Sequence, residues 1–117
     1  MSSILPGRIP DQVNTSAYPA GLTNAFRITT MTVPDTATAL PATPLTDRVA
    51  ISVTNLDATE ILYIGNSDVT ADRALGTTAG WEVGPGESFN VDVTDSIIIY
   101  GRAEASQTIL IKVLEIS

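Results

Sequence analysis

The feature that most constrains the fold is residues 48–65, RVAISVTNLDATEILYIG, in which two apolar patterns flank a short polar loop. Val49, Ile51 and Val53 alternate with small or hydroxylated residues, which is typical of a strand with one buried face. Residues 61–64 are nearly all apolar, which is typical of a strand buried on both faces. We therefore expect two strands at the centre of an antiparallel core, with Val49, Ile51 and Val53 pointing inward.

The segments on either side add short strands and turns, and no stretch of ten residues carries a helical stripe. Residues 26–33 place Phe26, Ile28, Thr30 and Thr32 on one face, and Pro34 ends this strand. Residues 89–93 alternate in the same way, and the run 97–100 is expected to pair with the last strand, 108–116, across a hairpin loop at 104–107. The side chains that we expect to be most buried are Ile51, Val53, Ile64, Val91, Ile99, Ile111 and Val113.

These strands at hairpin-like spacing predict an all-β fold, either an antiparallel β-sandwich or a small barrel. We favour a jelly-roll-like sandwich of about six to eight short strands over residues 26–117. Residues 35–47 are rich in Thr and Pro and are expected to form an extended edge segment or a strap over the core.

Residues 1–25 are expected to form an extended N-terminal arm, because Pro6, Pro10 and Pro19 forbid a long helix and a central strand. A disordered tail is the alternative. Apolar side chains that a purely solvated tail would not need are spaced along this segment, and an arm of this kind could dock on a neighbouring subunit. These side chains are Ile4, Leu5, Ile9, Val13, Tyr18 and Leu22.

The charge and the missing residue types exclude several classes of function. Thirteen acidic residues against six basic ones give a net charge of −7, so a nucleic-acid partner is not expected. The chain has no Cys and no His, which removes thiol chemistry, zinc sites of the usual kind and the common catalytic triads. Neither a secretory signal nor a membrane span is found in the sequence, so we expect synthesis in the cytoplasm and no membrane partner.

Carboxylate chemistry remains, and the candidates lie in or next to the loop 66–80. Asp68 and Asp72, with Asn66, could bind Ca²⁺, although the spacing lacks the EF-hand pattern and turn or capping roles fit as well. A glycosidase-like pair could be drawn from Asp68, Asp72 and Glu82 near Trp81, but short chains seldom build a deep cleft. We therefore expect no catalytic residue, cofactor or metal. Trp81 is interpreted as an interface anchor, with a core position as the alternative.

Residues 38 to the end carry a set of motifs that resembles one group of proteins. The motifs are the segment 38–70, PGES at 85–88, IIIYG at 97–101 and KVLEI at 112–116. They resemble small virion proteins of tailed bacteriophages, in which a Leu-Pro-rich strap, a YIG strand and a PGES-like turn recur. The loop 71–80 with the Trp81 that follows it departs from the pattern of that family, and the first 37 residues have no counterpart in it.

The resemblance implies a structural β-sandwich protein of the virion with no enzymatic activity. The first hypothesis is a capsid decoration or cement protein that binds the major capsid protein on the outside of the phage head. It would form a homo-oligomer, with a homotrimer favoured by assembly symmetry, and contact its partner through Ile4, Leu5, Ile9, Tyr18, Leu22 and Trp81. The alternatives are a head-to-tail connector, neck or tail component and, from another class, a carbohydrate-binding module with Trp81 and Tyr100 as stacking platforms.

Overall fold

A computed structural model of the chain describes residues 25–72 and 76–117, and every regular element in these residues is a β-strand. No helix there could span a membrane. The expected arm, apart from Ala25, lies outside the described residues. The strands are β2 (Phe26–Val33), β3 (Thr38–Ala39), β4 (Ala50–Asn55), β5 (Leu62–Gly65), β6 (Trp81–Val83), β7 (Ser88–Val91), β8 (Tyr100–Arg102) and β9 (Ile109–Ile116).

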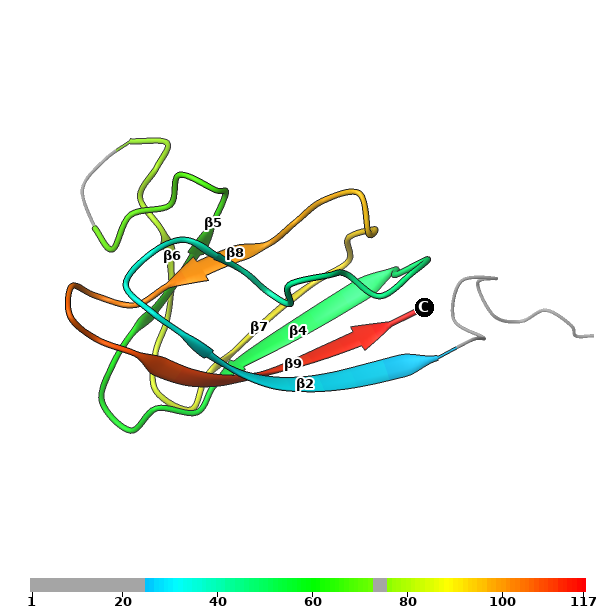
Figure 1. Cartoon of the computed structure of the whole chain (residues 1–117), viewed down its shortest axis with the longest axis horizontal. Helices are drawn as coiled ribbons and strands as arrows, with labels where there is room; N and C mark the ends of the chain where they lie inside the picture. The colour runs from blue at the N-terminus through cyan, green and yellow to red at the C-terminus, as the bar shows by residue number, and fades with distance from the viewer. Residues whose placement is uncertain (1–24, 73–75) are drawn as a thin grey trace, which may run out of the picture.

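The strands form two four-stranded antiparallel sheets with the orders β2-β9-β4-β7 and β3-β8-β5-β6 (Figure 1). The pairings are nested, since β2 pairs with β9, β3 with β8, β4 with β7 and β5 with β6. This arrangement is a long hairpin rolled into two facing sheets, which is the jelly roll that the strand pattern predicted. The described strands of one sheet make no ladder with those of the other, so the barrel alternative is wrong.

The central pair of predicted strands occupies the centre of the fold, one strand in each sheet. β4 lies between β9 and β7, and β5 lies between β8 and β6. On β4, Ile51 and Val53 point into the core as expected, whereas Val49 precedes the strand and is only partly buried. β5 is buried along Leu62, Tyr63 and Ile64, as the nearly continuous apolar run predicted.

The core lies between the inner faces of the two sheets. Most of the side chains that we expected to be buried are there, while Val91 and Ile99 are partly buried against it. A fully buried Val or Ile side chain contributes about 1.5–3 kcal/mol relative to an exposed one. The core residues are Val33, Leu40, Ile51, Val53, Leu62, Ile64, Val83, Ala103, Ile109, Ile111 and Val113.

One predicted pairing is wrong, namely the hairpin between the run 97–100 and the last strand. β8 starts only at Tyr100 and pairs with β3 and β5, while β9 pairs with β2 and β4 in the other sheet. The loop 104–107 therefore crosses from one sheet to the other. The reason is that both edges of β9 are already occupied, and Gly101 on β8 sits close against Leu40 and Leu62 in the second sheet.

Candidate functional site

Trp81 is the first residue of β6 and is 68% exposed, so the interpretation as a core residue is wrong. The register pairs it with Ile64 at the end of a short edge strand. An indole this exposed at a strand end is free to contact a partner, which is the geometry expected of an interface anchor.

The described parts of the loop, residues 66–72 and 76–80, pack against β5 and lead into Trp81. Thr70 forms a parallel bridge to Ala79, and Val69 is buried at 4% exposure, so both residues anchor this loop. Gly80 lies so near Tyr63 that an added Cβ would be 2.6 Å from the Tyr63 Cβ. The sequence of this loop therefore requires glycine at position 80 because the loop backbone lies directly on the strand.

A hollow of about 340 Å³ lies where the loop meets β6. It is lined by Asp72, Ala79, Gly80, Trp81 and Glu82. Two of the three acidic residues that we considered, Asp72 and Glu82, line this hollow together with Trp81, whereas Asp68 does not. Trp81 and Glu82 are consecutive on β6, so their side chains point to opposite faces of the sheet. An indole can stack on a ring, and a carboxylate at the same hollow can accept hydrogen bonds from hydroxyl groups. In residues 25–72 and 76–117, no group of three or more acidic side chains is placed to hold a metal ion.

The second proposed stacking residue, Tyr100, is not brought to Trp81. Residues directly opposite one another on paired strands share a face, so Trp81 lies on the face of Ile64 and Tyr100 on the face of Gly65. Ile64 and Gly65 are consecutive and therefore point to opposite faces of the sheet. The two rings cannot form one platform.

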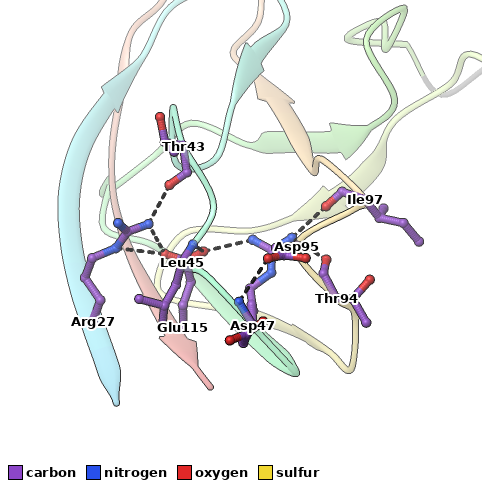
Figure 2. A network of polar contacts seen from close by, with 9 residues as sticks. Arg27, Thr43, Leu45, Asp47, Thr94, Asp95, Ile97 and Glu115 are labelled. Atoms are coloured by element: carbon purple, nitrogen blue, oxygen red, sulfur yellow. Dashed lines mark hydrogen bonds and ion pairs between the residues drawn. The ribbon is translucent and has the colours of Figure 1, made fainter. Parts of the chain in front are cut away.

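A second polar cluster, at the other end of the sandwich, centres on the fully buried Glu115 of β9 (Figure 2). Its Oε1 accepts hydrogen bonds from Arg27 at 3.1 and 2.6 Å, and its Oε2 accepts one from Arg48 at 2.9 Å. The backbone N–H of Leu45 also donates to Oε2 at 2.9 Å. Both carboxylate oxygens accept hydrogen bonds from groups inside the protein, so this carboxylate has a structural role.

The two arginines extend the cluster to neighbouring segments. Arg27 donates to the carbonyl oxygen of Thr43 at 2.6 Å, while Arg48 donates to those of Thr94 and Ile97 at 2.9 and 2.6 Å (Figure 2). β2, β9, the strap after β3 and the turn before β8 are thereby held together. The Arg48 Nε is buried with no partner among the described residues.

Our reading of the sequence missed this cluster, although a signal was present. The inward alternation of the last strand continues from Val113 to Glu115, a residue that we did not expect in the core. Glu115 is buried and Ile116 lies on the opposite, outer face. An acidic residue at an inward position requires a cationic partner, and Arg27 within the predicted strand 26–33 and Arg48 next to a buried strand were available.

Five of the six residues predicted to bind a partner lie outside the described residues: Ile4, Leu5, Ile9, Tyr18 and Leu22. Trp81 is therefore the one whose position the structure gives. A comparison of the chain with protein-family models and with curated proteins finds no match.

Proposed function

We propose that this protein is a structural component of a tailed-phage virion, most specifically a decoration or cement protein bound to the outer surface of the head. The jelly-roll order of the strands carries this proposal, because viral capsid domains use the same architecture. This is an argument by analogy of fold, since one fold hosts many functions. The motifs of residues 38–70, 85–88, 97–101 and 112–116 add to it.

The surface of the body supports a binding role. Large apolar side chains are exposed at several places, including Trp81 at 68% and Phe26 at 69%. Exposed aromatic side chains of this size are characteristic of protein contact surfaces. A homo-oligomer around a symmetry axis of the shell, with a trimer favoured, would present several copies of these contacts to the major capsid protein.

The test is the copy number of this chain relative to the major shell protein in purified particles, measured by quantitative mass spectrometry. A fixed simple ratio to the shell protein supports decoration of the head. A few copies per particle would overturn decoration and support a neck, tail or connector position. Absence from the particle would overturn a virion role altogether.

A carbohydrate-binding module is the second candidate, and the hollow at Trp81 favours it. Jelly rolls also occur in lectin domains, and this hollow is lined by Trp81 together with Asp72 and Glu82. A glycan array with the full chain tests this function. Binding that is lost in Trp81→Ala and retained in Ile97→Ala, a matched change at another exposed apolar residue, would favour it, and an array without response would remove it.

A further inference from the structure

The outer face of the first sheet carries an apolar surface where a solvated face would be polar. The register places Phe26 opposite Ile116 and Ile28 opposite Leu114, and Ile116 is in turn opposite Ala50 on β4. Phe26 is 69% and Ile28 58% exposed. We call these five residues the outer apolar surface. Contiguous apolar side chains from three adjacent strands indicate a contact surface rather than isolated exposed residues.

A hollow of about 190 Å³ adjoins this surface. Its lining comes from three adjacent strands: Leu114 and Ile116 of β9, residues 50–52 of β4, and residues 90–92 at and after the end of β7, with Ser52, Asn90 and Asp92 as the polar members. An apolar hollow with a polar rim can accept an inserted apolar side chain, the usual arrangement at the centre of a protein contact.

Residues 1–24 of this chain carry apolar side chains that match the outer apolar surface. They come just before β2 in the sequence. This segment carries six spaced apolar side chains and three prolines in a chain of low charge. An extended chain advances about 3.3 Å per residue, so 24 residues reach about 80 Å, while an eight-residue strand such as β2 is about 26 Å long. The segment is long enough to cross the sheet of another molecule completely.

The direction of the chain at Ala25 favours a second copy over the same molecule. The carbonyl oxygen of Ala25 accepts a hydrogen bond from the Ser117 N–H at 2.8 Å, so the antiparallel ladder of β2 and β9 continues through this residue. The start of β2 and the chain end after β9 lie side by side at one end of the sheet (Figure 1). At Ala25 the chain therefore runs along the direction of β2, in the plane of the sheet and past its end, rather than over its outer face.

We propose that residues 1–24 of one copy bind the outer apolar surface of a second copy of this chain. Apolar side chains of the segment cover Phe26, Ile28 and Leu114 of the neighbour, and one of them fills the adjoining hollow. Repeated around a symmetry axis, this exchange closes an oligomer. The proposal concerns contacts between copies and does not rest on the virion role.

The absence of cysteine from the chain permits a test with single thiols in the full-length protein. Ser52→Cys places a thiol at the hollow, and Ser3→Cys and Ser16→Cys place one in the segment. Ser67→Cys, in an exposed loop of the other sheet, is the control. Pairs of variants are mixed, oxidised and mapped by mass spectrometry of the disulfide-linked peptides.

We expect Ser52→Cys to form mixed disulfides with at least one segment variant, in at least about tenfold higher yield than Ser67→Cys does. Equal yields would indicate random collision and overturn the proposal, as would the absence of a mixed disulfide with both segment variants. A chain that carries both thiols and closes an internal disulfide, under conditions where mixed dimers do not form, would show that the segment covers its own molecule and would also overturn it.

The apolar character of the surface is tested by adding a charge to the Ser52→Cys chain. Ile28→Asp should lower the yield of mixed disulfide at least about tenfold, because the burial of one Ile side chain is worth this factor or more. Thr30→Asp is the matched control on the same strand and face, opposite Lys112, and should change the yield less than about twofold. Equal losses in both variants would overturn the apolar contact. Circular dichroism checks folding, and Phe26→Ser replaces Ile28→Asp if that variant does not fold.

Discussion

Glu115 of β9 is the buried charged residue that connects several distant segments of the fold. Its carboxylate is fully buried and is held by Arg27, Arg48 and one backbone N–H. A buried ion pair adds little net stability compared with apolar residues of the same volume, because removing two charges from water offsets their attraction. The pair instead determines which segments meet, since Arg48 also binds the turn at Thr94 and Ile97.

Glu115→Ala should therefore destabilise the protein strongly, by about 3–5 kcal/mol, because it leaves the buried Arg48 without a counter-charge. Arg27→Ala should cost less, because the Arg27 side chain is 39% exposed and water can replace part of its contact. Urea unfolding followed by far-UV circular dichroism measures both. Equal costs would contradict the prediction, because they would show that losing the contact of Arg27 alone is as damaging as losing the whole carboxylate.

Asp57 shows how a loop carboxylate fixes the turn between β4 and β5. Its Oδ2 accepts hydrogen bonds from the backbone N–H groups of Thr59 at 3.0 Å and Glu60 at 2.8 Å. These bonds, that from Thr59 foremost, hold the pKa of Asp57 below its usual value of 3.8. The buried Asn55 supports the same turn by donating to the carbonyl oxygens of Glu60 and Val83.

Because the pKa of Asp57 is lower in the folded state, the ionised form stabilises the fold above about pH 4, and this contribution is lost as the pH falls through the folded pKa. Asp57→Asn should therefore reduce the loss of unfolding free energy between about pH 5 and pH 2.5. Urea titrations at several pH values, compared with the unchanged chain, measure the difference. An identical acid dependence in both proteins would show that Asp57 does not contribute to it.

At the scale of the element, β9 shows what alternation predicts well. Ile109, Ile111 and Val113 point inward at 0% exposure, while Leu110 between them is 44% exposed. Chemically similar side chains thus have opposite environments one residue apart, as a period of two requires.

Ile111→Ala should cost about 2–5 kcal/mol, because it removes buried surface and leaves a cavity. Leu110→Ala, the matched control on the same strand, should cost well under half of that. Denaturant unfolding of the two variants measures the difference. A change below about 0.5 kcal/mol at Ile111 would place this side chain outside the core.

The error at β8 shows what alternation does not predict. A short apolar run near a longer strand, with a turn between them, has the local pattern of a hairpin. The structure instead places β8 between β3 and β5, because β2 and β4 already pair with both edges of β9. Partner choice depends on segments far away along the chain.

At the scale of the whole molecule, the nested pairings bring the first described strand beside the last. Phe26 pairs with Ile116 and Val33 with Ile109, so most ladders join distant segments. We expect folding in milliseconds to seconds and a single unfolding transition, because such non-local contacts must form together. Stopped-flow refolding, and equilibrium unfolding followed by two probes, test this expectation. Folding in microseconds would contradict it.

The sequence by itself determined the all-β class, most strand positions, most of the core and which residues of β2 share a face, since alternation and turn residues act over a few neighbours. It also pointed to the group of Asp72, Trp81 and Glu82, because these residues are close along the chain. Only the tertiary structure decided the pairing of β8, the burial of Glu115 with Arg48, the separation of Tyr100 from Trp81 and the continuity of the outer apolar surface. Each of these depends on which distant strands lie side by side, and local patterns of polarity do not contain that information.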